Sequence, residues 1–214
     1  MVNISPETSP ALSIDCEFGH AGEVGHLTMD IHAGEIVVLT GENGAGKSTL
    51  IDTVAGELEP VAGTVRVRDA ESGVLLDPAT PDAAGQITRI AAPSFLPDLT
   101  LGEHLDLMSL RTGIGIDDLL DRALPWQIED LPDTLPSRLS SGQRQRANLG
   151  IQLAVASGVI ALDEPERHLD ADWTCVLCDR LRALAEGGAT VIVASHSPVV
   201  IAAADRTIHL QAAL

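Results

Sequence analysis

The sequence predicts an α/β fold with a parallel-sheet core, an N-terminal antiparallel β subdomain and a small helical subdomain. Three observations support this prediction. An apolar run at 36–39 leads into a glycine-rich loop and then a helix, the order found in open parallel sheets. Two later apolar runs, 159–162 and 190–194, each stop at polar residues, as buried parallel strands do. Residues 93–150 show helix signals in place of strand patterning.

The chain outside the core runs shows the alternation of apolar and polar residues that is typical of half-buried strands. It occurs at 12–16, 27–31 and 64–68, and predicts antiparallel strands on both sides of the glycine-rich loop. Phe18 lies in the turn predicted after the first strand. Its ring can pack in the core or stack on a nucleotide base, and the residues leave both interpretations open.

The glycine-rich loop has the pattern G-x-x-x-x-G-K-[ST] between a strand and a helix, which predicts a phosphate-binding loop. Glycines allow successive N–H groups to point inward, and the N-terminus of the next helix adds positive potential. Lys47 supplies a full positive charge, and the Ser48 hydroxyl can ligand Mg²⁺. The predicted nucleotide-binding residues are Gly41, Glu42, Asn43, Gly44, Ala45, Gly46, Lys47, Ser48 and Thr49.

The predicted helical subdomain spans residues 93–150 and interrupts a core made of residues 1–92 and 151–214. Thr100 and Glu103 have the spacing of a capping box, which predicts a helix running to about residue 111. A second helix is expected over 117–124, because Pro125 stops it. The whole chain of 214 residues is expected to form one domain.

A second potential anion site lies in the stretch Leu-Ser-Ser-Gly-Gln at 139–143. Either Ser140 or Ser141 can cap a helix that runs to about residue 156. The start of that helix offers free N–H groups to an anion. Many helices begin in this way, so the stretch gains its weight from the motifs that follow it.

Acidic and imidazole side chains follow the two late apolar runs, at the sheet edge where α/β folds bind ligands. Asp163 can hold Mg²⁺ opposite Ser48, and Glu164 can polarise a water for attack on a terminal phosphoryl group. His196 follows the next strand, so it joins the same edge and can hydrogen-bond the terminal phosphate. These residues indicate hydrolysis of a nucleoside triphosphate.

Composition narrows the class of protein further. The formal net charge is -18, which argues against a nucleic-acid partner because phosphate backbones repel such a chain. Apolar runs are too short to span a bilayer, and the first residues lack the features of a signal peptide. We therefore expect a cytoplasmic protein with its three cysteines reduced.

The order of these motifs resembles that of the ATP-binding cassette (ABC) ATPases, over nearly the whole chain. The resemblance implies a P-loop NTPase fold with a RecA-like core. By the same resemblance, the family's motifs are Walker A at 41–49, the signature at 139–143, Walker B at 159–164, the D-loop at 169–170 and the switch histidine at His196. Phe18 occupies the place of the family's base-stacking aromatic residue.

The resemblance also implies a mechanism. Two cassettes pack head to tail, as a homodimer or heterodimer, and each ATP lies between the Walker motifs of one and the signature of the other. Ser140, Gly142 and Gln143 would then contact the partner cassette's nucleotide. Closure on Mg-ATP moves a separate transmembrane permease, which would hold the chain at the inner face of the cell membrane. Lys47, Glu164 and His196 are the implied catalytic residues.

Three departures from the family pattern stand out. Ser141 replaces the second glycine of the signature, and the residues at 166–168 before the D-loop are bulky and charged. The loop that opens the helical subdomain lacks the family's glutamine, since Gln86 lies too far upstream.

We predict the ATP-hydrolysing subunit of an ABC transporter. The alternatives are a soluble ABC ATPase without a membrane partner and a nucleotide-gated module with weak hydrolysis. The missing glutamine favours the last alternative, whereas Glu164 and His196 argue against it.

Overall fold

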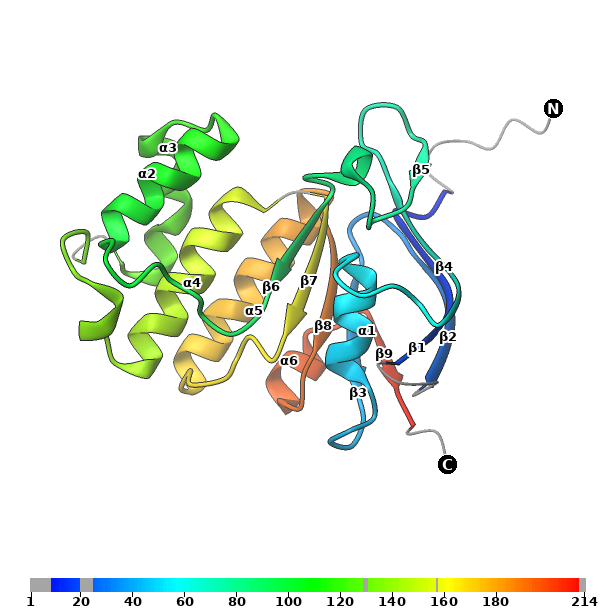
Figure 1. Ribbon diagram of the computed structural model, residues 1–214. Coiled ribbons are helices and arrows are strands. Elements are labelled where there is room, and N and C mark those ends of the chain that lie inside the picture. Colours follow the sequence, from blue (N-terminus) through cyan, green and yellow to red (C-terminus); the bar gives the residue numbers. More distant parts are fainter. Residues whose placement is uncertain (1–8, 20–24, 129–130, 157, 212–214) are drawn as a thin grey trace.

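The parallel sheet sits at the centre of the fold (Figure 1). The computed structural model describes residues 9–19, 25–128, 131–156 and 158–211. Five strands pair in parallel in the order β6 (Ile87–Ile90), β7 (Val159–Asp163), β8 (Thr190–Ala194), β3 (Ile36–Thr40) and β9 (Arg206–His209). Parallel strands end at the same edge, so the polar residues after β3, β7 and β8 share that edge.

A second, antiparallel sheet covers one side of the molecule. Its strands pair in the order β2 (Gly25–Ile31), β1 (Leu12–Phe18), β4 (Ala62–Arg68) and β5 (Leu75–Leu76). Leu12 pairs with Ile31 on one side and with Val67 on the other, which places apolar side chains on one face. The predicted antiparallel strands are therefore confirmed, each extended by two residues.

Alternate residues of each parallel strand face two different hydrophobic clusters. Val37 and Leu39 of β3 pack with β1, β4 and the first helix, whereas Ile36 and Val38 pack with the later helices. β7 and β8 alternate in the same way. A strand buried on both faces reads as a continuous apolar run, which explains why these strands show no polar alternation in the sequence.

In the part of the chain that the structure describes, six α-helices and three short 3₁₀ turns connect the strands. The first helix lies against the antiparallel sheet side, and the later helices cover the opposite face (Figure 1). The α-helices are α1 (Lys47–Val54), α2 (Leu101–Thr112), α3 (Ile116–Ala123), α4 (Ser141–Val155), α5 (Ala171–Glu186) and α6 (Pro198–Ala202). The 3₁₀ turns are η2 (Pro81–Ala83), η3 (Leu124–Trp126) and η4 (Pro136–Arg138).

Two helices of the predicted helical subdomain start at complete capping boxes. The Thr100 hydroxyl accepts from the Glu103 N–H at 3.3 Å, and the Glu103 carboxylate accepts from the Thr100 N–H at 2.7 Å. Ser140 and Gln143 form the same reciprocal pair at the start of α4. The capping box predicted at Thr100 is confirmed, and Ser140 rather than Ser141 is the cap of α4.

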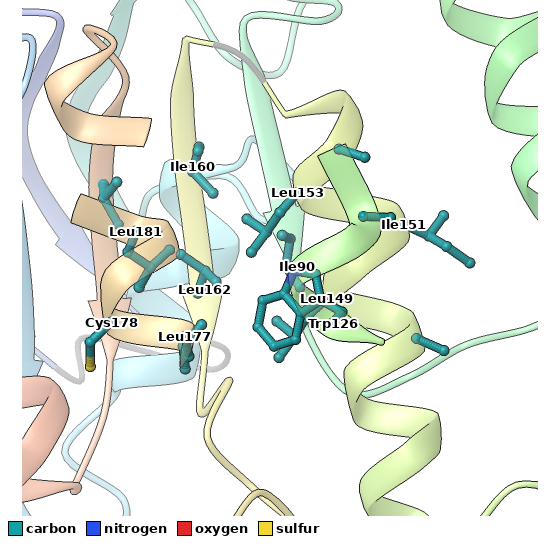
Figure 2. Packing of buried hydrophobic residues seen from close by; sticks show 14 of the residues in the cluster. Ile90, Trp126, Leu149, Ile151, Leu153, Ile160, Leu162, Leu177, Cys178 and Leu181 are labelled. Atoms are coloured by element: carbon teal, nitrogen blue, oxygen red, sulfur yellow. The ribbon is translucent and has the colours of Figure 1, made fainter. Parts of the chain in front are cut away.

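The helical segments share one hydrophobic cluster with the parallel sheet. Figure 2 shows Trp126 and Leu149 in the cluster that also contains Ile90 of β6 and Leu162 of β7. Gly150 leaves room for the indole, because a Cβ there would lie 3.1 Å from the Trp126 ring. The boundaries at 93 and 150 stay predictions, and α4 passes residue 150 without a break.

Within the described ranges, no helix has the length and apolar character that crossing a membrane requires. The longest, α5, has 16 residues and buries only one of its faces.

Candidate active site

The loop after β3 has a backbone that only glycine adopts without strain. Gly41 has φ 143°, and a Cβ on it would lie 2.5 Å from the carbonyl oxygen of Leu210. Gly46 has φ 85° and is the residue before α1, which begins at Lys47. A side chain at Gly41 would collide with the end of β9, so the tight wrap of the loop depends on glycine there.

Lys47 is the only lysine in the chain, and its ammonium is held inside the loop. Its side chain is 7% exposed, and Nζ donates to the carbonyl oxygens of Gly41 at 2.9 Å and Glu42 at 3.0 Å. An ammonium has three N–H donors, so a phosphate oxygen can take the third. The charge is thus positioned at the mouth of the loop before any anion arrives.

Two adjoining hollows meet at Ser48 and Glu164. The first has a volume of about 340 Å³ and is lined by the loop, including Lys47, and by Glu164. The second has about 250 Å³ and brings Ser48 together with Asp163, Glu164 and Gln145. A basic loop beside two carboxylates suits a phosphate chain with a divalent cation at its end.

Asp163 at the end of β7 has the features of a cation ligand. Its Oδ1 is buried and has no hydrogen-bond partner among the described residues. Burial raises the pKa of its carboxyl above the ordinary 3.8, and a hydrogen bond with Ser48 opposes this effect. Glu164 and Asp52 raise the pKa of Asp163 further, and the Arg89 guanidinium lowers it.

These oxygens fit Mg²⁺ by their chemistry. A hydroxyl and one carboxylate leave most coordination positions to phosphate and water, as Mg²⁺ prefers. The described residues contain no cluster of three His, Cys, Asp or Glu side chains that could hold a metal alone. The cation would therefore depend on the nucleotide for its remaining ligands.

Glu164 lines both hollows and has a strained backbone conformation. Its φ is 47°, in the left-handed region that L-residues other than glycine rarely adopt. The strand β8 holds this conformation, because the Glu164 N–H donates to the Ala194 carbonyl oxygen at 2.9 Å. Strain of this kind at a ligand site is typical of catalytic side chains.

His196 lies at the same sheet edge but outside the hollows. β7 and β8 are in register from Val159 to Asp163, with Asp163 opposite Ala194, and His196 comes two residues after Ala194. The side chain is exposed, and it is not among the described residues that line the hollows. Its predicted role at the terminal phosphate stays a prediction.

The start of α4 borders a separate hollow of about 180 Å³, lined by Ser140, Gly142, Gln143 and the turn at 168–170. The Ser140 hydroxyl accepts from the Gln143 N–H at 3.2 Å, which leaves its own proton free to donate. This third hollow shares only His168 with the second, so it is separate from the hollow that contains Ser48 and Asp163.

Phe18 does not fit the base-stacking role that the resemblance implied. Its side chain is 1% exposed and lies in the cluster beneath the antiparallel sheet. A Cβ on Gly25 would lie 2.7 Å from the Phe18 ring, so the opposite strand closes over it. The expectation is wrong for this structure because β1 extends through Phe18 and turns its ring inward.

Gln145, a buried polar residue that lines the second hollow, was not predicted from the sequence. Ala92 and Pro93, in the loop that lacks the family's glutamine, line the second hollow. Gln145 of α4 lines the same hollow. Gln145 is 3% exposed, and its Nε2 donates to the Pro165 carbonyl oxygen at 2.7 Å. The signal in the sequence that could have identified Gln145 is its polar side chain on the face of α4 that is buried. Gln86 lies at the opposite end of β6 and donates to Asp69 at 2.7 Å.

Comparison with known proteins gives a consistent result. Residues 24–167 match the family model described as ABC transporter. The chain is 34% identical to the cytochrome c biogenesis ATP-binding export protein CcmA of Novosphingobium aromaticivorans, over 89% of this chain and 90% of that protein. It is 32% identical to the macrolide export ATP-binding/permease protein MacB of Salmonella typhimurium, over 86% of this chain. That match spans only 29% of the MacB protein.

Among solved structures, the fold is similar to a dimeric ATP-binding cassette in a post-hydrolysis state bound to ADP and Pi. The TM-score is 0.79 at 23% identity, and the match covers 94% of this chain and 93% of that one. At this identity the likeness concerns the fold, and it confirms the predicted parallel core with its antiparallel and helical parts.

Proposed function

This chain belongs to the ABC transporter family of ATPases, and from that premise we propose that it powers a separate membrane-spanning permease by hydrolysing ATP. The observation that carries the proposal is the meeting of the two hollows at Ser48 and Glu164. A phosphate chain in the first hollow would end beside the carboxylates of the second. That is where a cation and an attacking water are needed.

Binding would use the loop and its single lysine. The N–H groups of the glycine-rich loop and the ammonium of Lys47 would take the phosphates, and the N-terminus of α1 would add positive potential. Ser48 and Asp163 would hold Mg²⁺. The bound cation supplies charge neutralisation at the terminal phosphate.

Hydrolysis would use Glu164 as general base. Because Glu164 lines both hollows, its carboxylate can lie beside the terminal phosphate and accept a proton from water. We assign His196 to the orientation of the terminal phosphate. Its present position outside the hollows requires that loop to move when nucleotide binds.

A second cassette would complete each site. The start of α4 lines a hollow to which none of the phosphate-loop residues 41–49 contributes, so its N–H groups suit a nucleotide held by another copy. The dimeric form of the structurally similar cassette supports this arrangement. Closure on ATP and opening after hydrolysis would then produce movement.

A groove beside the helical segments supports docking of a permease. It has about 690 Å³ and includes Arg111 and Arg122 in a chain whose net charge is -18. Arg111 and Arg122 are exposed. The groove therefore suits a partner segment that carries acidic side chains. Arg111→Glu with Arg122→Glu should abolish co-purification with a membrane protein. The single change Arg66→Glu on β4 shows the effect of reversing one charge outside the groove and should leave co-purification intact.

The main test uses Glu164→Gln, which keeps the shape of the site and removes the base. With Mg-ATP this variant should bind nucleotide, shift to a dimer on size-exclusion chromatography and show no turnover, while the wild type hydrolyses ATP. Turnover by Glu164→Gln would refute the assignment of the base. ATP binding without dimer formation would refute the second-cassette proposal for this chain alone.

A further inference from the structure

A half-buried carboxylate next to the active site, that of Glu166, has no role in the mechanism above. Glu166 lies two residues after Glu164, in the turn that leads to the loop residues 168–170. Its Oε1 accepts a hydrogen bond from the Ser195 hydroxyl at 2.5 Å. Its Oε2 is buried and has no hydrogen-bond partner among the described residues. A buried carboxylate oxygen without a donor costs free energy, so stability alone does not account for this residue.

The Ser195 hydroxyl, which donates to Glu166, links the two residues on either side of His196. Ser195 is fully buried, and its N–H donates to the Leu39 carbonyl oxygen at 3.1 Å, beside the start of the phosphate loop. Its Oγ also accepts from the Ser197 N–H at 3.0 Å. The Ser195 hydroxyl thus donates to Glu166 and accepts from Ser197, and His196 is held between two residues that this hydroxyl fixes.

The other side of Glu166 is tied to the partner-facing turn. Its carbonyl oxygen accepts from the Leu169 N–H at 2.9 Å, and the Arg167 N–H donates to the Glu164 carbonyl oxygen at 3.1 Å. His168 in this turn has φ 69° and borders both the second and the third hollow. Movement of the turn would therefore reach Ser195 through a single side chain.

From these contacts we propose that Glu166 is a positioning residue that couples the turn at 166–170 to the loop bearing His196. Its hydrogen bond to Ser195, and not its charge, sets where His196 stands when the partner cassette presses on the turn. The inference rests on the proposed hydrolysis and on the proposed role of His196. It adds a path by which dimer closure reaches the terminal phosphate.

Variants that change either the length or the charge of the Glu166 side chain distinguish this proposal from a purely electrostatic or structural role. Glu166→Gln keeps the length and a carbonyl oxygen that can accept from Ser195, whereas Glu166→Asp keeps the charge but is one methylene too short. We expect Glu166→Asp to lower kcat about tenfold, the effect of losing roughly one hydrogen bond. Glu166→Gln should retain most of the turnover, and the KM for ATP should change little in both.

Ser195→Ala should reproduce the loss seen with Glu166→Asp, and the two changes together should be no worse than either alone, as for partners in one interaction. Ser72→Ala is the matched control, because Ser72 donates to Asp69 at the same 2.5 Å on the exposed β4–β5 turn. It should leave kcat unchanged. Two outcomes would overturn the proposal. One is a double variant whose loss of kcat is the product of the two single losses, and the other is a Glu166→Gln variant with kcat as low as that of Glu166→Asp.

A readout without turnover keeps the inference separate from the proposed function. Amide hydrogen exchange of Ser197, followed by NMR in the nucleotide-free protein, should accelerate in Glu166→Asp and stay slow in Glu166→Gln. If the wild type fails to hydrolyse ATP while this pattern holds, the proposed function fails and the structural coupling stands. Equal Ser197 exchange in wild type and Glu166→Asp would overturn the coupling itself.

Discussion

Ser48 and Asp163 line the same hollow, where the first turn of α1 meets the end of β7. Asp163 Oδ1 is buried there and has no hydrogen-bond partner among the described residues. A carboxylate in this state destabilises the folded chain until a cation arrives, because burial penalises its charge. The Asp163 oxygen that suits a catalytic cation therefore lowers the stability of the nucleotide-free protein.

Replacing Asp163 by asparagine should stabilise the nucleotide-free protein while abolishing turnover. Asparagine removes the desolvated charge and keeps the size of the side chain, so we expect the melting temperature to rise by about 1–3 °C at neutral pH. Thermal unfolding without nucleotide and an ATPase assay with Mg²⁺ test the two halves. Asp172→Asn, at an exposed position in the first turn of α5, is the control and should not raise the melting temperature. A less stable Asp163→Asn protein would contradict the account of burial.

The stabilisation by Asp163→Asn should depend on pH with a defined sign. Burial raises the folded-state pKa of Asp163 above 3.8, so the folded chain holds this proton more tightly than the unfolded chain. The free energy of unfolding therefore falls as the pH rises from 3.8 to the raised folded-state pKa of Asp163. Above that pKa the full destabilisation by the buried charge is present. The difference in melting temperature between variant and wild type should shrink as the pH approaches about 4. A difference that is constant with pH would exclude Asp163 titration as the cause.

Lys47 should be protected from amine-directed acylation by ATP. It carries the only side-chain amine in the chain, and its partly free ammonium faces the first hollow. Bound phosphates would occupy its remaining donor and block access, so labelling at Lys47 should fall when Mg-ATP is added. Peptide mass spectrometry measures the modification, with the chain's α-amine as the internal reference. Equal labelling with and without nucleotide would place the phosphates elsewhere.

Much of the fold could be predicted from local signals in the sequence. The apolar runs that became β7 and β8 are buried on both faces, and the capping boxes at Thr100 and Ser140 mark helix starts through their own side chains. The phosphate loop is also a local feature, because its glycines and Lys47 act within nine residues. Such features depend on neighbours in the chain and can be read without the tertiary structure.

Other residues depend on contacts between distant segments. Phe18 is buried because a strand that follows it folds back over its ring. Gln145 reaches the second hollow only because α4 passes behind Pro165, and Glu166 meets Ser195 across 29 positions. No spacing rule predicts these pairs. The sequence showed that Glu166 is unusual at its place, but its partner could be found only in the folded chain.

Gly142 of the signature should be intolerant of a side chain, although it is only partly buried. A Cβ there would lie 3.1 Å from the carbonyl oxygen of His168, so Gly142→Ala would push on the turn that borders both the second and third hollows. We expect turnover to fall about tenfold or more while ATP binding to the monomer stays unchanged, because the phosphate loop is untouched. Steady-state kinetics and calorimetric ATP binding in the Glu164→Gln background measure the two effects. Ser141→Gly is the matched control: it changes the adjacent, exposed position and should leave turnover intact or raise it. If Gly142→Ala weakened ATP binding and turnover equally, α4 would act within its own chain's nucleotide site, and the arrangement of two facing cassettes would lose its main structural argument.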